Sequence, residues 1–210
     1  MTTPWTLYLA AGTCAQAVHI ALHDAGAEHR VQRVDFAAGE QRSPAYLAVN
    51  PRGRVPALVT ERGTLTEVPA LLLFIAQSFP SVRLAPLDDP FRLAQLQSFN
   101  SYLCSTVHVA HAHKRRGARW ADDAAAHEAM QRKVPANMAE CSAHIEAEWL
   151  RDGPWVMGAD YSIADPYLFT IAEWLEGDGV DPSPFPRLLA HRARMAARES
   201  VQATKAALAL

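Results

Sequence analysis

The chain has 210 residues, of which 50% are hydrophobic and 20% are charged, with a formal net charge of −2 at pH 7. This composition is typical of a soluble globular protein, and the length suffices for one large or two small domains. The near-neutral net charge gives no field that would attract a polyanion, so nucleic acid is not the default partner. No apolar run is long enough to span a membrane, and the first ten residues lack the basic and apolar regions of a secretory signal.

The first 35 residues predict a βαβ unit. The predicted elements are a strand at residues 5–9, a helix at residues 14–25 and a second strand at residues 30–35. Small residues form the first turn, and Gly26 ends the helix. A connection of this length indicates parallel strands joined by a right-handed crossover.

The next part of the chain predicts a short helix, a hairpin and a longer helix. Ser43 is a suitable N-cap for a short helix with Pro44 in its first turn. Residues 57–60 and 64–65 predict antiparallel strands around a tight turn, and a helix follows at residues 67–79.

The dipeptide Val55-Pro56 comes directly before the first strand of this hairpin. Proline cannot donate a ladder hydrogen bond, so we expect it at a sheet edge or at the start of a strand, with Val55 extended before it. Val55 would then offer its N–H and C=O to an extended guest peptide. Peptide physics alone predicts a trans bond here, because only about 5–6% of X-Pro bonds are cis.

Residues 80–90 contain three prolines and two aspartates and predict a linker. We therefore expect a first domain at residues 1–80, a linker at residues 81–90 and an all-helical domain at residues 91–210. The predicted helices cover residues 90–116, 122–150 with an interrupting proline, 162–175, and 187–208 as one or two pieces.

The third of these helices begins with a capping-box pattern. Ser162 is expected to accept a hydrogen bond from the backbone N–H of Asp165, whose carboxylate reaches back to the start of the helix. Apolar residues follow at helical spacing, so this helix is predicted to form the core of the second domain.

Two stretches resemble a known family. The motifs NPRGRVPAL and LTE, followed by a helix, resemble the glutathione-binding half of glutathione transferases, and WVMGADYSIADPYLFTIAEW resembles the buried helix of their second domain. The resemblance covers nearly the whole chain. It implies an α/β plus all-α fold class, with a thioredoxin-like N-terminal domain (βαβ-ββα) and a helical-bundle C-terminal domain.

The resemblance implies a glutathione site at Val55, Pro56, Glu67 and Val68. In that family the proline is cis, and the backbone of the preceding residue pairs with the cysteinyl part of glutathione. Glu67 would lie near the γ-glutamyl amino group. Val68 would offer a backbone N–H at a helix start but no hydroxyl, because the family usually has serine or another small residue there.

Three further residues are candidates for glutathione contacts. Arg54 is next to Val55 and suits either a glutathione carboxylate or a solvated loop position. Asn100 and Ser101 fall near the position from which the family reaches into the partner subunit's site, and either or neither of them does so.

Cys14 is the first catalytic candidate. It opens a helix, where the helix dipole and unpaired backbone N–H groups lower the pKa of a thiol. The stretch AGTCAQAVHI places it where bacterial beta-class enzymes carry their cysteine. Leu9 and Ala15 stand where a tyrosine and a serine are usual, so the hydroxyls of those residues are not available. The alternative is a small buried residue at a helix start.

His108 is the second catalytic candidate. Its position matches a histidine that reaches the glutathione sulfur in beta-class enzymes, and an imidazole can hydrogen-bond a thiol or stabilise its thiolate. Val109 replaces the neighbouring lysine of the family. The alternative is a polar lining residue without a catalytic role. His108, His111 and His113 form a His-x-x-His-x-His pattern, but we expect no metal site there, because only the first two share a helix face and no carboxylate joins them.

The remaining cysteines favour a reducing compartment. Cys14, Cys104 and Cys141 are widely spaced and form no Cys-x-x-Cys pair, which favours reduced thiols in the cytoplasm over disulfides. We expect Cys104 and Cys141, on apolar helical faces, to be inert core thiols.

The resemblance implies a cytoplasmic, homodimeric detoxification enzyme with glutathione as cosubstrate. It would conjugate or transfer the glutathione thiol to small electrophilic or disulfide substrates, without nucleic acid or membrane partners. Cys14 would be either a weak hydrogen-bond donor or a nucleophile that forms a mixed disulfide. The alternatives are a non-catalytic ligand- or partner-binding protein and a glutathione-dependent isomerase or dehalogenase.

Overall fold

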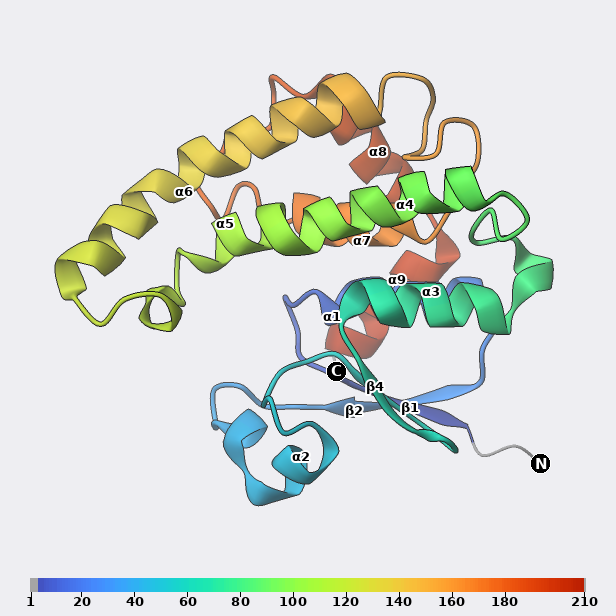
Figure 1. Ribbon diagram of the computed structural model, residues 1–210, viewed down its shortest axis with the longest axis horizontal. Coiled ribbons are helices and arrows are strands. Elements are labelled where there is room, and N and C mark those ends of the chain that lie inside the picture. The colour runs from blue at the N-terminus through green and yellow to red at the C-terminus, as the bar shows by residue number, and fades with distance from the viewer. Residues whose placement is uncertain (1–3, 210) are drawn as a thin grey trace. The chain divides into compact units, whose positions relative to one another are not determined.

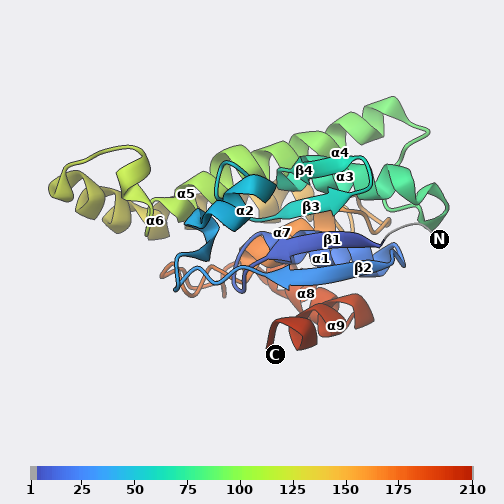
Figure 2. The same cartoon turned by 90° about the horizontal axis from the view of Figure 1, so that it is seen from below.

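A four-stranded sheet with the order β2-β1-β3-β4 lies at the centre of the N-terminal unit in the computed structural model, which describes residues 4–209 (Figure 1). The strands are β1 Trp5–Leu9, β2 His29–Arg33, β3 Ala57–Thr60 and β4 Gly63–Thr66. Figure 2 shows them side by side in this order. Residues 1–3, which open the expected first domain, and residue 210 lie outside the described residues.

The pairing of the strands confirms the predicted βαβ-ββα pattern. Strand β1 pairs in parallel with β2, with Trp5 opposite His29, and antiparallel with β3, with Leu7 opposite Leu58. The parallel pair requires a crossover, which helix α1 (Ala15–Asp24) provides. Ser43 caps α2 (Pro44–Val49) by accepting a hydrogen bond from Tyr46 N, as predicted.

The core of this unit lies between the sheet and the helices α1 and α3 (Val68–Ser78), which cover the same face, with α2 on the other side (Figure 1). Fully buried aliphatic side chains come from both layers: Leu7, Leu9, Leu58, Ile20, Leu22, Leu71, Leu72 and Ile75. Each such burial contributes about 1.5–3 kcal/mol. This packing fixes both the start of α1 and the loop before β3.

The C-terminal helix α9 (Glu199–Ala209) differs from the expectation of one helical domain at residues 91–210. The chain forms two compact units, and residues 197–210 belong with residues up to 90. Helix α9 packs against α1, and Arg198 donates a hydrogen bond to Asp24 at 2.8 Å. Its helical pattern alone did not reveal this partner. The expected domain boundaries at residues 80 and 90 stay predictions.

The second unit, residues 91–196, is helical. Its main helices are α4 Pro90–Tyr102, which begins at the boundary, α5 His108–Ala112, α6 Ala124–His144, α7 Ala164–Ala172 and α8 Pro186–Ala196. Helix α6 contains Pro135, and Asp123 caps it by accepting a hydrogen bond from Ala126 N. Among the described residues, no helix has both the length and the apolar character needed to cross a membrane.

The first predicted helix of this unit, residues 90–116, differs from the structure in two ways. A π-helical turn at Leu103–Val107 separates α4 from α5, and the helix ends at Ala112. The backbone N–H groups of Lys114 and Arg115 bond to carbonyls three residues earlier, which tightens the chain into turns. A second π-helical turn, Ile145–Trp149, follows α6.

Helix α7 forms the core of this unit, as predicted, because every one of its residues is buried. Asp165 Oδ2 accepts the backbone N–H of Ser162 at 2.8 Å, which confirms the return half of the capping box. The other half differs: the Ser162 hydroxyl accepts from Ala164 N rather than from Asp165 N. The Asp165 N–H instead bonds to the Ser162 carbonyl.

Candidate functional site

The loop before β3 places the bond between Val55 and Pro56 at the start of that strand, and the bond is cis. The trans bond that peptide physics predicts is therefore wrong here. The intrinsic preference for trans at X-Pro is only about 0.5–1 kcal/mol, which surrounding contacts outweigh. The family resemblance implied the observed isomer.

Two buried side chains of the neighbouring α2 region hold this loop by the Arg54 carbonyl. The Tyr46 hydroxyl donates to it at 2.6 Å, and Asn50 Nδ2 donates at 2.7 Å. Burial raises the pKa of Tyr46 to about 12, so its hydroxyl remains a donor at neutral pH. Sequence reasoning missed both residues. Their spacing of four on a short helix was the available signal, since it places them on one face.

Cys14 lies at the N-cap position of α1 and is 8% exposed. Its Sγ donates a hydrogen bond to the Val55 carbonyl at 3.8 Å. The preceding turn is held by Thr13, whose hydroxyl donates to the Ala10 carbonyl at 2.7 Å. Folding thus brings a thiol at a helix N-terminus next to the backbone that precedes Pro56.

The strand residues before this turn alternate between the two faces of the sheet. Leu9, in the position of the family's tyrosine, is fully buried in the core. The ring of Tyr8 packs against Tyr46, with centroids 5.6 Å apart.

Glu67 has a strained backbone conformation directly before α3. Its φ of 71° lies in a region that a non-glycine side chain rarely adopts, and such strain costs about 1–3 kcal/mol. The side chain is 61% exposed, and its Oε1 accepts a hydrogen bond from Arg52 Nη1 at 2.7 Å. Val68 begins the helix and is buried. An exposed ion pair contributes little stability, so the pairing with Arg52 does not by itself offset the strain at Glu67.

The two arginines of this loop have different surroundings. Arg52, which the sequence reasoning missed, holds the Glu67 carboxylate. The Arg54 side chain is exposed, while its carbonyl accepts the two hydrogen bonds from the α2 region. The structure therefore groups Cys14, Val55 and Pro56 at one place, and Arg52 and Glu67 at the start of α3.

The other candidates belong to the second unit and are described within it. His108 begins α5 directly after the π-helical turn, and its ring contacts Trp174 with centroids 5.1 Å apart. His111 stacks on the same tryptophan and bonds through Nδ1 to the buried Asp178 at 2.7 Å. On α4, Asn100 is fully buried and Ser101 is exposed.

The two other thiols differ from each other. Cys141 is buried, as predicted, and burial raises its pKa. Cys104 is only half-buried, so the prediction of a core thiol is wrong for it. All three cysteines lie in the described part of the chain, and no disulfide joins them.

Comparison with known proteins identifies the family. The model of the glutathione S-transferase N-terminal domain matches residues 11–78, and that of the C-terminal domain matches residues 120–199. Glutathione S-transferase GstA of Escherichia coli O157:H7 is 30% identical over 201 residues, which cover 93% of this chain and 94% of the relative. The chain belongs to the glutathione S-transferase family.

Solved structures of bacterial members agree with this. A glutathione transferase homologue from Sulfitobacter with bound glutathione is 48% identical in sequence and has a TM-score of 0.94. The match covers 97% of this chain and 98% of that chain. A beta-class glutathione S-transferase from Sphingomonas chungbukensis is 34% identical and has a TM-score of 0.84. The match covers 97% of this chain and 98% of that chain.

These matches confirm the fold class and the bacterial beta-class-like resemblance. They also confirm the prediction that the protein is an enzyme, a glutathione-dependent transferase with glutathione as its cosubstrate. They do not favour the alternatives, a non-catalytic binding protein or an isomerase or dehalogenase.

Proposed function

We propose that this enzyme transfers the glutathione thiol to small electrophilic or disulfide substrates through a site built around Cys14. The observation that carries the proposal is the 3.8 Å contact between Cys14 Sγ and the Val55 carbonyl, at a helix N-terminus. A peptide thiol paired with the Val55 backbone would have its sulfur close to Cys14. A helix N-terminus stabilises a thiolate formed there.

Glutathione would bind as a short extra strand. Its cysteinyl N–H and C=O would pair with the backbone of Val55, as in other complexes in which a peptide extends a sheet. Its γ-glutamyl amino group would contact Glu67, which Arg52 holds in place, and its α-carboxylate would accept the N–H of Val68 at the start of α3. Pro56 fixes the Val55 backbone, and Arg54 is proposed to contact the glycyl carboxylate.

Two reactions are open to such a site. In thiol transfer, the Cys14 thiolate attacks the glutathione sulfur of a mixed disulfide, forms a Cys14–glutathione disulfide and releases the other thiolate, which takes up a proton. A second glutathione thiolate then regenerates Cys14 and leaves as glutathione disulfide. In conjugation, the bound glutathione thiolate attacks an electrophile and forms a carbon–sulfur bond. The step either displaces a leaving group as an anion or opens a ring, whose released oxygen then takes up a proton.

Further parts of the proposal concern the second unit and the assembly. His108 is proposed to hydrogen-bond the glutathione sulfur as donor. Asn100 and Ser101 are the candidates for a position facing a partner subunit, and the exposed side chain favours Ser101. We propose a cytoplasmic homodimer that acts in detoxification, and sedimentation of the purified protein measures the oligomeric state.

Isothermal titration with reduced glutathione tests the proposed function. The wild type is expected to bind one glutathione per chain with a Kd between roughly micromolar and millimolar. The Cys14→Ala variant is expected to bind with a changed enthalpy, since its sulfur contact is lost. If the wild type shows no binding at millimolar glutathione, the proposed site is refuted. Val68, where the family has a small residue, would then mark a γ-glutamyl subsite that has been lost.

The substitution Tyr46→Phe tests how the loop is held. It removes the hydrogen bond to the Arg54 carbonyl, and we expect a loss of about 1 kcal/mol in unfolding free energy and a several-fold weaker glutathione Kd. Urea unfolding and titration measure the two effects. The control Tyr161→Phe, in the second unit, should leave the Kd unchanged; an equal loss in both variants would argue against the positioning role.

The substitution Glu67→Gly tests the strained residue. Glycine tolerates a φ of 71°, so the substitution relieves the strain, but it also makes the unfolded chain more flexible. We expect a net rise of about 1 kcal/mol in the free energy of unfolding. Glutathione affinity should fall about tenfold, because the carboxylate is lost. The matched control Glu61→Gly, at an exposed glutamate without a positive φ, should lower stability instead.

A further inference from the structure

Three histidines from two elements of the N-terminal unit converge at one place. His19 and His23 are one turn apart on α1, and His29 is the first residue of β2. Each offers one ring nitrogen, and these nitrogens all lie within 4.8 Å of one another. The ring centroids are 4.6 to 5.1 Å apart. The sequence reasoning did not single out this cluster, since the residues are joined only by the crossover of the fold.

The pair on α1 has the spacing that a shared metal ion requires. His19 Nε2 and His23 Nε2 are 3.2 Å apart. Two imidazoles bound to one ion at about 2.0–2.1 Å and a tetrahedral angle hold their nitrogens about 3.3 Å apart. Histidines four residues apart on a helix are a recurrent chelating pair for this reason. The α1 pair therefore needs little rearrangement to bind an ion.

The third histidine is held in the tautomer that a ligand needs. His29 Nδ1 lies 2.8 Å from the Ala27 carbonyl, which can only accept, so Nδ1 carries the proton. The lone pair of the neutral ring is then on Nε2. A backbone carbonyl that fixes the outer nitrogen is the usual support for a metal-bound histidine.

The surroundings favour neutral rings and a bound cation. Burial, and then the neighbouring His23 and His29, lower the pKa of His19 to about 3, so its ring is neutral at pH 7. Burial and His29 also lower the pKa of His23. His19 Nε2 and His23 Nε2 contact each other at 3.2 Å, so one of the two carries a proton that a bound ion would displace. The last turn of α1 offers the negative end of the helix dipole.

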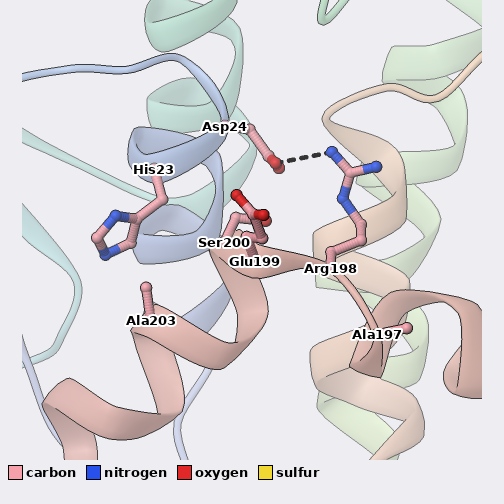
Figure 3. A pocket seen from close by; sticks show the side chains of 7 residues that line it. All are labelled: His23, Asp24, Ala197, Arg198, Glu199, Ser200 and Ala203. Carbon is pink, nitrogen blue, oxygen red and sulfur yellow. Dashed lines mark hydrogen bonds and ion pairs between the residues drawn. The ribbon is translucent and has the colours of Figure 1, made fainter.

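The site has access to solvent beside a pocket that His23 helps to line, with Asp24, Arg198, Glu199 and Ser200 among the other residues. His23 and His29 are half-buried, whereas His19 is 1% exposed. In Figure 3 the His23 ring points away from the ion pair of Asp24 and Arg198, so that pair does not occupy its nitrogens.

We propose that His19, His23 and His29 form a binding site for one divalent transition-metal ion, of the class that prefers imidazole, such as Zn²⁺. Three imidazoles leave a fourth tetrahedral position for water. Along α1, His19 is five positions from Cys14 and His23 is nine positions from it, a rise of about 7.5 Å and about 13.5 Å, so the site is distinct from the thiol site and does not depend on the proposed function. An ion there would join the end of α1 to the start of β2.

Titration of the tag-free protein with ZnCl₂ at pH 7.5 tests the proposal. The wild type is expected to bind one Zn²⁺ per chain, with a rise in melting temperature. His23→Gln and His29→Gln are the main variants, because both residues are half-buried and the substitutions preserve size and polarity. Each should weaken binding at least about tenfold and abolish the rise in melting temperature, as loss of a ligand does.

Two controls separate this site from other metal-binding groups. Cys14→Ala removes the thiol, and His113→Gln removes a histidine of the second unit; both should bind Zn²⁺ like the wild type. Co²⁺ should give the visible absorption of a tetrahedral nitrogen-ligated ion in the wild type and not in His29→Gln. The proposal would be overturned if the wild type did not bind Zn²⁺ at millimolar concentration. It would also be overturned if His23→Gln and His29→Gln bound Zn²⁺ like the wild type while a control variant did not.

Discussion

Asp165→Ala is expected to lower the free energy of unfolding by about 3–5 kcal/mol, because it removes a buried carboxylate that holds several buried donors. The carboxylate is fully buried at the start of α7. One oxygen accepts the backbone N–H of Val156 at 2.9 Å and contacts His191 Nε2 at 3.1 Å. The other accepts the backbone N–H of Ser162 at 2.8 Å. Alanine would leave these groups buried without their acceptor.

The effect extends beyond the cap because Asp165 joins three segments of the second unit. Val156 lies in the loop before α7, and His191 lies on α8, so the carboxylate fixes both against the buried helix. Urea unfolding followed by circular dichroism measures the loss. The matched control is Asp160→Ala, which removes an exposed carboxylate paired with Arg92 and should change stability by less than about 1 kcal/mol.

A second variant keeps the prediction testable if Asp165→Ala does not fold. Asp165→Asn retains one acceptor oxygen but places an N–H₂ group against a buried donor. Its free energy of unfolding should therefore lie between those of the wild type and Asp165→Ala. A loss below about 1 kcal/mol for both variants would contradict the role assigned to the carboxylate.

Cys14→Ala is expected to reduce thiol-transfer activity by about 10³-fold or more while conjugation falls by less than about tenfold. The difference arises because thiol transfer needs a protein sulfur that forms a covalent bond, and Cys14 supplies the sulfur that hydrogen-bonds to the Val55 carbonyl. Conjugation needs only a stabilised glutathione thiolate, to which Cys14 contributes a weak S–H hydrogen bond. Reduction of a glutathione mixed disulfide and conjugation of an aryl chloride measure the two activities.

The control for this variant is Cys104→Ala, which removes a half-buried thiol in the second unit and should leave both activities unchanged. Mass spectrometry after exposure to glutathione disulfide should find the adduct on Cys14 in the wild type. If both activities survive in Cys14→Ala, the residue is a buried helix-start residue and not catalytic. If both fall equally, its role is to position glutathione.

Local signals in the sequence determined most of the secondary structure. Strand β1 and helix α1 follow from short apolar patterns and from Gly26, which ends the helix, and Ser43 marks the start of α2. These features depend on residues within one or two turns of each other, so the pattern contains the information needed. The position of Cys14 at the start of a helix also follows from the local pattern.

Other features were decided only by contacts between distant residues. The conformation of Glu67, its pairing with Arg52 and the packing of α9 on α1 have no signature in the local pattern. The same is true of the histidine cluster, whose third member arrives through the β1–β2 pairing.

The sequence by itself thus determined the order of the elements and the residue types available for chemistry. The tertiary structure decided which of those residues meet. The physical reason is that helix and strand periodicity are set by neighbouring residues, whereas backbone strain, X-Pro isomer and side-chain clusters depend on small free-energy differences of about 1–3 kcal/mol that the surrounding packing outweighs.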